Sequence, residues 1–400
     1  MAAETANEAL RDAVIRHQIF LLRYSGSVRN RMLNVLADTE EEVGRRIRDR
    51  LANNQGLATG VEMRRMEALV ESIGEIRGAA WETANGILTD EMVGLASREP
   101  AHLSGIIRTV SPTEIVVALP APQLLRNIVT RRPFQGRVLR EWAAKMRDDD
   151  IRQIANQVRM GMIAGEPSPE IARRVIGTAR ARGADGILEL TRRQVNTVVR
   201  TAVQHVANEA RAEFARENSD IIQSETYVAT LDAATTPVCR ANDGRQFPVG
   251  RGPQPPLHYN CRSTRIPSIS PEFGAERPNK PVTERMLVRE YAEKNGLGDI
   301  SSRDKLPRGT KGDFDKFARR RTRELVGPIP ASVNYQTWLT GQPTEFQNEV
   351  LGVAKAKLFR DGGLTLDKFV HRTGDELTLS ELASKHADAF RAAGLDPAKF

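Results

Sequence analysis

The residues best suited to chemistry lie in one short segment of this 400-residue chain. Both cysteines of the protein, Cys239 and Cys261, fall there, and His258 precedes the second one by three positions. Thiolate and imidazole groups are zinc ligands, and His-x-x-Cys is a spacing that a zinc site can use. A closed structural site needs four ligands, so the fourth would be Asp232, Asp243 or water. A zinc site is therefore one hypothesis for this segment.

Two other interpretations of the segment stay open. A disulfide between Cys239 and Cys261 would close the loop, although so few cysteines are typical of a protein made in a reducing cytoplasm. In the structural interpretation, which we favour, the cysteines are small buried apolar groups, His258 hydrogen-bonds to the backbone and Asp232 caps a turn.

Catalysis by the same residues is disfavoured. In a triad, Cys239 would be the nucleophile, His258 the base and Asp232 the group that orients it. However, Cys239 is flanked by Val238 and Arg240 and has no glycines suited to an oxyanion hole. A His-Asn-His nuclease is also disfavoured, since the segment contains a single histidine. We therefore expect no enzymatic activity.

The segment lies where the hydrophobic pattern changes from helical to extended. A long helix is predicted over 189–218, followed by a strand over 224–231. The loop over 232–261 is dense in Pro, Gly, Asn and Asp, and a second strand is predicted over 262–269. The chemistry-bearing residues therefore belong to a small α+β unit with a long loop.

The first half of the chain has apolar residues at a period of 3.6, which predicts successive helices. Residues 110–123 interrupt this pattern with a short apolar run that suits a strand or an extended linker. The predicted helices are one that ends at Ser25–Gly26, one from about Val28 into the fifties, one over 61–79, one from near Trp81, one after Gly136, one over about 151–162, and one capped by Ser168 with Pro169 as its first residue.

The second half contains 15 of the 20 aromatic residues, which marks a change of architecture. We predict a mainly α protein with extended N-terminal helices, a small α+β core domain and a small helical C-terminal domain. The predicted parts are 1–130 (N-terminal helices), 131–270 (core domain), 271–330 (a basic linker with one helix near 283–295) and 331–400 (C-terminal domain).

The net charge of +8 is concentrated in one region. Residues 301–330 carry nine basic and four acidic side chains, which suits a solvated helix face or linker, or a contact with DNA or an acidic partner. The candidate contact residues are Arg308, Lys311, Lys316, Arg319, Arg320, Arg321 and Arg323. No apolar run approaches the ~18 residues that a transmembrane helix needs, so no membrane span is expected.

The order and spacing of these residues resemble the core motif of the phage Mu F-like minor head proteins, also called head morphogenesis proteins. That motif has Arg-Thr on a helix, then Leu-Asp-x-x-Thr-x-x-x-Cys-Arg-x-x-Asp-Gly, then Pro-Pro-x-His-x-Asn-Cys-Arg. The matching residues are Arg200, Thr201, Leu231, Asp232, Thr235, Cys239, Arg240, Asp243, Gly244, Pro255, Pro256, His258, Asn260, Cys261 and Arg262. The resemblance covers about 140–270, with Tyr259 where such proteins often have proline.

The resemblance implies a structural role in a tailed bacteriophage. Members of the family are minor components of the procapsid, associated with the portal vertex or the inner capsid face. The implied partners are the portal protein, the major capsid protein and double-stranded DNA, and the implied location is the virion, assembled in the host bacterial cytoplasm. The alternatives are a DNA-binding packaging or ejection protein and, less favoured, a zinc-dependent enzyme built on Cys239, His258 and Cys261.

Overall fold

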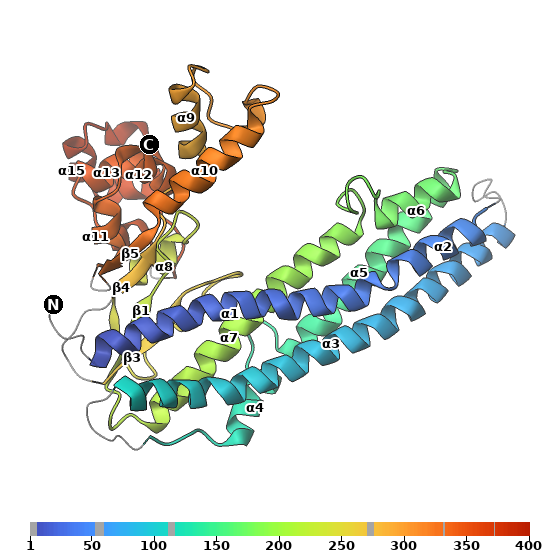
Figure 1. Ribbon diagram of the computed structural model, residues 1–400, viewed down its shortest axis with the longest axis horizontal. Helices are drawn as coiled ribbons and strands as arrows, with labels where there is room; N and C mark the ends of the chain where they lie inside the picture. Colours follow the sequence, from blue (N-terminus) through green and yellow to red (C-terminus); the bar gives the residue numbers. More distant parts are fainter. Residues whose placement is uncertain (1–5, 53–59, 111–116, 270–275, 331–332, 372) are drawn as a thin grey trace.

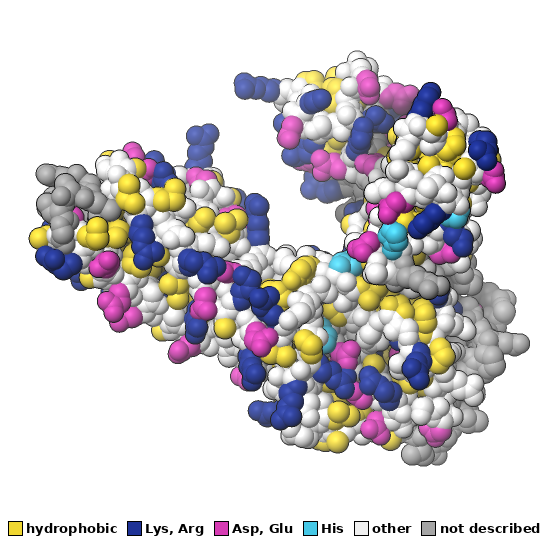
Figure 2. Space-filling model, turned by 180° about the vertical axis from the view of Figure 1, so that it is seen from behind, with side chains coloured by type: hydrophobic (Ala, Val, Ile, Leu, Met, Phe, Trp, Pro, Cys, Tyr) yellow, Lys and Arg dark blue, Asp and Glu magenta, His cyan; other side chains and the backbone are white. Residues whose placement is uncertain are grey.

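The computed structural model of the chain describes residues 6–52, 60–110, 117–269, 276–330, 333–371 and 373–400. The protein is mainly helical with a small α+β region, as predicted, and this region contains a three-stranded sheet. Figure 1 shows an elongated arm of helices that ends near the sheet, with a body of short helices beyond it. Seen from behind, the surface is hollowed between the arm and this body (Figure 2).

Long helices form the arm and pack through small and aliphatic side chains. Its elements are α1 (Ala6–Ala37), α2 (Glu40–Arg50), α3 (Gly60–Val110), α4 (Pro122–Arg131), α5 (Leu139–Ile163), α6 (Ser168–Ile176) and α7 (Leu188–Glu217). α1 and α3 lie side by side, and both pack on α7. Val199, Ala202 and Val203 of α7 are fully buried in this core beside Trp81 of α3. The long helix predicted over 189–218 is confirmed as α7.

The predicted helix end at Ser25–Gly26 is wrong, because α1 continues to Ala37. The Ser25 hydroxyl donates to the carbonyl of Leu22 at 2.7 Å, so it is satisfied inside the helix. A glycine within a helix costs only about 1 kcal/mol, which the continuous apolar stripe of α1 offsets by packing on α3 and α7. The chain turns instead at Asp38 and Thr39, before α2.

Two further predicted interruptions are absent from the helices that the structure describes. The separate helices predicted over 61–79 and from Trp81 form the single helix α3, since Ala79 and Ala80 favour helix at the proposed break. The two helices predicted after Gly136 likewise form α5. α6 begins at Ser168 itself, one residue earlier than predicted, with Pro167 at the N-cap position.

The break predicted over 110–123 lies partly outside the described residues, at 111–116. Residues 117–121 form neither helix nor strand, and α4 follows. The backbone of Ala118 is held from α7, because the Asn218 side chain accepts from its N–H and donates to its carbonyl. Of the two structures predicted here, a strand or an extended linker, residues 117–121 therefore form the extended linker.

The sheet lies at the end of α7 and contains both predicted strands. Its strands are β1 (Ser224–Val228), β2 (Gln246–Pro248) and β3 (Thr264–Ser268), in the order β2-β1-β3 and antiparallel throughout. The short helix α8 (Pro237–Asn242) and β2 form within the segment predicted as a loop. Ile266 of β3 packs with Phe214 of α7 and with Leu10 and Val14 of α1, so the N-terminal helix also supports the sheet.

The segment predicted as a basic linker contains more regular structure than one helix. Its elements are β4 (Glu276–Asn279), α9 (Glu284–Lys294), η1 (Arg303–Lys305), α10 (Lys311–Leu325) and β5 (Gly327–Pro330). β4 and β5 pair antiparallel, and α9 and α10 form a helical hairpin around Val288, Tyr291 and Phe314. The helix predicted near 283–295 is confirmed as α9, whereas α10 and both strands were not predicted.

The C-terminal helices enclose an aromatic core, as predicted. The elements are α11 (Tyr335–Thr340), α12 (Thr344–Leu351), α13 (Val353–Arg360), η2 (Leu366–Phe369), α14 (Leu379–Lys385), α15 (Ala387–Ala392) and η3 (Pro397–Lys399). Tyr335, Trp338 and Phe346 are buried together with Phe359 and Phe369. Leu231, which follows β1, joins the same cluster, so the aromatic core continues into the α+β unit.

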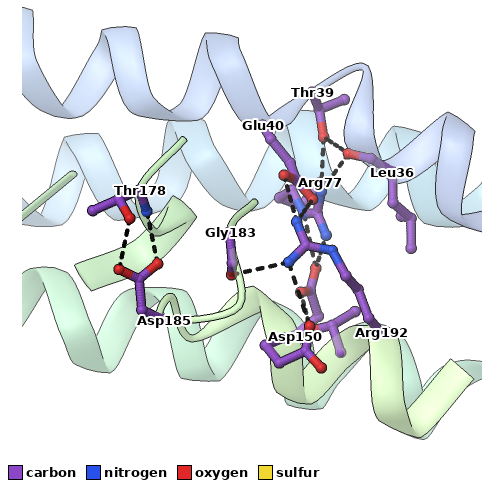
Figure 3. A network of polar contacts seen from close by, with 11 residues as sticks. Leu36, Thr39, Glu40, Arg77, Asp150, Thr178, Gly183, Asp185 and Arg192 are labelled. Carbon is purple, nitrogen blue, oxygen red and sulfur yellow. Dashed lines mark hydrogen bonds and ion pairs between the residues drawn. The ribbon is translucent and has the colours of Figure 1, made fainter. Parts of the chain in front are cut away.

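A buried ion pair joins four segments of the arm (Figure 3). The side chains of Arg77 on α3 and Asp150 on α5 are each 1% exposed and form an ion pair at 2.8 Å. Asp150 also accepts from Trp81 Nε1 at 2.8 Å and from Thr191 Oγ1 at 2.6 Å, and Arg77 donates to the carbonyl of Leu36. This network holds the end of α1 to α3, α5 and α7.

None of the helices, over the residues that the structure describes, has both the length and the apolar character to cross a membrane.

Candidate functional site

Cys239, His258 and Cys261 come together in one cluster beside the sheet. Cys239 lies on α8, and the other two lie in the turn before β3, where the Cys261 N–H donates to the His258 carbonyl at 3.2 Å. The two Sγ atoms are 3.7 Å apart, and Cys239 Sγ is 3.3 Å from His258 Nε2. Both cysteines are only 1% exposed, whereas His258 is half-buried.

Hydrogen bonds within the cluster separate the pKa values of its members. The Cys261 thiol and His258 both donate toward Cys239, which lowers the pKa of Cys239. The contact with Cys239 and burial raise the pKa of Cys261, and the hydrogen bond to Cys239 raises the pKa of His258. The arrangement therefore favours a Cys239 thiolate beside a positively charged His258.

Of the alternatives for these residues, neither the disulfide nor the triad is present. Cys239 and Cys261 are free thiols, since their sulfurs lie well beyond the disulfide bond length of about 2.05 Å. Asp232, the third member of the hypothetical triad, forms a two-pronged ion pair with Arg262 at 2.6 and 2.8 Å. His258 Nδ1 instead faces the carbonyl oxygen of Tyr259 at 2.8 Å.

Asp232 organises the start of the loop, as its predicted turn-capping role requires. Its Oδ1 accepts from the Ala234 N–H at 3.1 Å and from Thr235 Oγ1 at 3.2 Å. Thr235 Oγ1 also bonds to the carbonyl of Thr230. Together with the Arg262 ion pair, these bonds fix the beginning of the loop to its end. The carboxylate of Asp232 therefore stabilises the conformation of the loop.

The motif residues Arg240, Asp243 and Gly244 contact the C-terminal helices. Arg240 donates to the carbonyl of Val350 at 2.9 Å, and its guanidinium lies 5.5 Å from the centre of the Tyr335 ring. Asp243 accepts from the Ala229 N–H at 2.7 Å and from the Tyr335 N–H at 2.6 Å.

Gly244 adopts a φ of +77°, and a Cβ there would meet the Cβ of Asn334 at 2.8 Å, so a side chain would push the C-terminal helices away.

Thr201 and Asn260 join α7 to the turn that carries His258. The Asn260 N–H donates to Thr201 Oγ1 at 3.0 Å, and Asn260 adopts a φ of +58°, a left-handed conformation that asparagine tolerates well. Arg200 is half-buried on the same helix, and its pKa is lowered by burial and then by the positive charges of Arg262 and Arg29. The helix therefore positions the turn through Thr201.

The basic candidates lie apart from this cluster, on and before α10. Arg308, Lys316, Arg319 and Arg320 are exposed, while Lys311 is half-buried. Arg321 pairs with Glu290 of α9 at 3.0 Å and with Glu324 at 2.9 Å. The side chain of Arg323 lies outside the described residues. The basic surface is therefore partly neutralised by acids of its own hairpin.

Sequence reasoning missed two hydroxyl groups that contact the cluster. Tyr227 on β1 is fully buried, and its hydroxyl donates to Cys239 Sγ at 3.2 Å. Thr236 Oγ1, at the N-cap position of α8, lies 2.8 Å from His258 Nε2. The sequence places Tyr227 in a strand next to the cysteine loop. Nothing in the sequence predicts the register that directs its hydroxyl to Cys239.

Comparison with known proteins agrees with the motif. Residues 152–266 match the family described as Phage Mu protein F like protein. The match spans the second half of α5, α6, α7, the sheet and the cysteine–histidine cluster. Among curated proteins and among solved structures, nothing matches this chain. Residues 152–266 are therefore similar to this family, and we call them the Mu F-like domain.

Proposed function

We propose that this protein is a minor head protein of a tailed bacteriophage that binds the portal protein during procapsid assembly. The observation that carries the proposal is the Mu F-like domain over 152–266, since this family has a role in phage head morphogenesis. The protein is then a structural component of the virion, at the portal vertex or the inner capsid face, and it assembles in the bacterial cytoplasm. The major capsid protein is the second partner of the proposal.

The far end of the arm offers a surface for such a partner. The beginning of α3 packs on the end of α5 through Met66, Leu69 and Met162. Around this contact, large apolar side chains point to solvent, among them Met160, 54% exposed, and Ile163, 70% exposed. Figure 2 shows hydrophobic side chains on this part of the arm. Exposed apolar groups at the end of a rigid arm suit docking to another protein.

Co-purification of the full-length chain with its cognate portal protein tests the proposal. The wild-type chain is expected to form a stable complex, and the double variant Met160→Ser, Ile163→Ser is expected to weaken it about tenfold or more. The matched control is Leu119→Ser, which removes a side chain that is 56% exposed but lies away from α5. A wild-type chain that binds neither the portal protein nor the major capsid protein would overturn the proposal.

Deleting residues 1–130 is not a suitable variant for this test. Leu21, Val28 and Met32 of α1 and Trp81 of α3 lie in the same core as Val199 of α7. Removing them would expose the apolar face of the Mu F-like domain itself. Surface substitutions on the full chain avoid this problem, because they leave the core intact.

A second candidate function, DNA binding by α10, is favoured by one observation. The side chains of Lys316 and Arg320 are 76% and 74% exposed on this helix, with Arg319 exposed beside them. These cations could contact the phosphate backbone of packaged DNA. This function would be compatible with portal binding, because α10 is remote from the end of the arm in Figure 1.

The salt dependence of DNA affinity tests this second function. Replacing Lys316, Arg319 and Arg320 by glutamine is expected to reduce the slope of log affinity against log salt by about 0.9 for each phosphate that the variant no longer neutralises. Arg321→Gln is the matched control and should change the slope less, because Arg321 is less exposed and pairs at 3.0 and 2.9 Å, whereas the pairs of Lys316 and Arg320 are longer, at 3.4 and 4.0 Å. Equal slopes for wild type and triple variant would rule out α10 as the DNA-binding surface.

A further inference from the structure

We propose that Cys239, His258 and Cys261 bind one zinc ion, with a water molecule as the fourth ligand. The ion would be held by the two Sγ atoms and by His258 Nε2. These three ligand atoms lie within 4.8 Å of one another, and they come from two segments that the ion would join, α8 and the turn before β3. The inference does not depend on head assembly, so a failure of portal binding would leave it untouched.

The distances in the cluster fit tetrahedral coordination. With Zn–S bonds of about 2.3 Å and a Zn–N bond of about 2.05 Å, a tetrahedral ion separates its two sulfurs by about 3.8 Å and a sulfur from a nitrogen by about 3.6 Å. The observed separations are 3.7 Å between Cys239 Sγ and Cys261 Sγ and 3.3 Å between Cys239 Sγ and His258 Nε2. Two of the three ligand separations therefore need shifts of only a few tenths of an ångström.

Groups around the cluster orient the ligands as outer-shell partners do in metal sites. His258 Nδ1 lies 2.8 Å from the Tyr259 carbonyl and would keep its proton there, so Nε2 would release its proton and turn its lone pair to the ion. The Tyr227 hydroxyl donates to Cys239 Sγ, which stabilises a thiolate. The His-x-x-Cys turn is itself fixed by the bond from Asn260 to Thr201. The ligands are thus held in place by α7 and β1.

The carboxylates that the sequence suggested as a fourth ligand are committed elsewhere. Asp232 is paired with Arg262, and both oxygens of Asp243 accept backbone N–H groups. Thr236 Oγ1, 2.8 Å from His258 Nε2, is placed to hydrogen-bond a water on the ion. His258 also lines a cavity of about 810 Å³ between α8 and the segment around His371, which gives solvent and the ion a path to the cluster.

The ligand set favours zinc among the common metal ions. Two thiolates and an imidazole are soft and borderline donors, which disfavours Mg²⁺ and Ca²⁺, and iron–sulfur clusters generally take four cysteines. Because α8 and the turn before β3 are linked by a segment that is mostly loop, an ion between them would act as a staple. The binding free energy would then contribute to folding of the Mu F-like domain.

Metal content of the purified full-length chain is the first test. The chain is expressed without a histidine tag in zinc-supplemented medium, and elemental analysis is expected to find one zinc per chain. Cys261→Ser and His258→Ala are expected to lower this content at least tenfold. His371→Ala is the matched control: this histidine faces the same cavity and pairs with Glu381, so its loss should leave the zinc in place.

A spectroscopic test covers the case in which the variants fail to fold. Wild-type protein stripped of metal and given Co²⁺ alone is expected to show a thiolate-to-cobalt charge-transfer band that zinc then abolishes. Two reactive thiols in the stripped protein, and their protection by zinc, complete the expected result. Little zinc in the purified chain together with no cobalt–thiolate band would overturn the proposal, as would a Cys239–Cys261 disulfide or tight binding of copper in place of zinc.

Discussion

Two buried polar centres hold distant segments together in this protein, and they do so in different ways. Asp150 in the arm receives hydrogen bonds from Arg77, Trp81 and Thr191, so its carboxylate is satisfied entirely by the protein. The cluster of Cys239, His258 and Cys261 instead turns three metal-ligating atoms toward one another. The buried carboxylate of the arm is therefore satisfied by the protein's own side chains, whereas the proposed zinc site would need an ion from outside to complete it.

Removing the carboxylate of Asp150 should produce the largest effect. Asp150→Ala leaves Arg77 buried without its counter-ion, and we expect a loss of about 3–5 kcal/mol in the free energy of unfolding of the arm. Urea denaturation followed by tryptophan fluorescence measures it, since Trp81 contacts Asp150 directly. Asp148→Ala, which removes a carboxylate that is 57% exposed, is the control and should cost no more than about 1 kcal/mol. Equal losses for the two variants would contradict the role of the buried pair.

A double substitution sharpens the same test. Replacing the pair with apolar side chains, Arg77→Met and Asp150→Leu, removes both charges at once and should recover most of the lost stability. If the double variant is as unstable as Asp150→Ala alone, the carboxylate stabilises the arm mainly through Trp81 and Thr191 rather than through Arg77.

Removing zinc with a chelator should destabilise the region around the cysteine–histidine cluster and leave the region around Asp150 unchanged. If zinc at a thousandfold excess over its Kd stabilises the Mu F-like domain, its removal costs about 4 kcal/mol. Hydrogen exchange with and without EDTA is expected to show faster exchange in α8 and β3 and unchanged exchange in α3 and α5 around Asp150. Identical exchange in α8 and β3 under both conditions would show that the cluster is complete without a metal.

The contact between the Mu F-like domain and the C-terminal helices is expected to be of intermediate strength. Asp243→Ala leaves the N–H groups of Ala229 and Tyr335 without their acceptor, and we expect a loss of about 2–3 kcal/mol. Limited proteolysis after Tyr335 should become faster in parallel. Asp388→Ala, at a side chain that is 97% exposed, is the control and should leave both measurements unchanged.

The smallest expected effect on stability comes from an exposed carboxylate, that of Glu381. The Thr378 N–H, the Thr378 hydroxyl and His371 lower the pKa of Glu381 from 4.5 to about 2. Because the folded state favours the charged form, this contribution is present above pH 4.5 and is lost as the pH falls through about 2. Titration by NMR should find the low pKa. A value near 4.5 would show that the capping contact does not persist in solution.

The sequence predicted the cysteine–histidine cluster because rare residue types stand out at fixed spacings. Long helices, both strands that flank the cysteine loop and the aromatic C-terminal core were also predictable, since each depends on local periodicity or composition. The helix ends within α1 and α3 were not, because Ser25 and Ala80 are compatible with a turn or a helix and tertiary packing decides between them.

The Asp150 centre could not be predicted for a different reason. Asp150 belongs to the run Asp148-Asp149-Asp150 on a helix, and the rotation of that helix buries both Asp149 and Asp150 but brings only Asp150 to Arg77. Nothing in the sequence distinguishes Arg77 from a surface arginine. Its burial follows from the structure, in which Leu36 and Thr39 accept its N–H groups. The helix α10 was not predicted either, because the charge density of its segment suggested a linker.

The way α1 is buried has a consequence for synthesis of the chain. The apolar face of α1 packs against α7 and, through Leu10 and Val14, against Ile266 of β3. At roughly 5–20 residues per second, the ribosome needs about 10 to 50 seconds after completing α1 to make those partners. α3, the other partner of α1, is complete at residue 110, but the part of α1 that α7 and β3 cover stays accessible to chaperones, neighbouring nascent chains and proteases during that interval. The yield of folded protein should therefore depend on translation speed across α3 to α7.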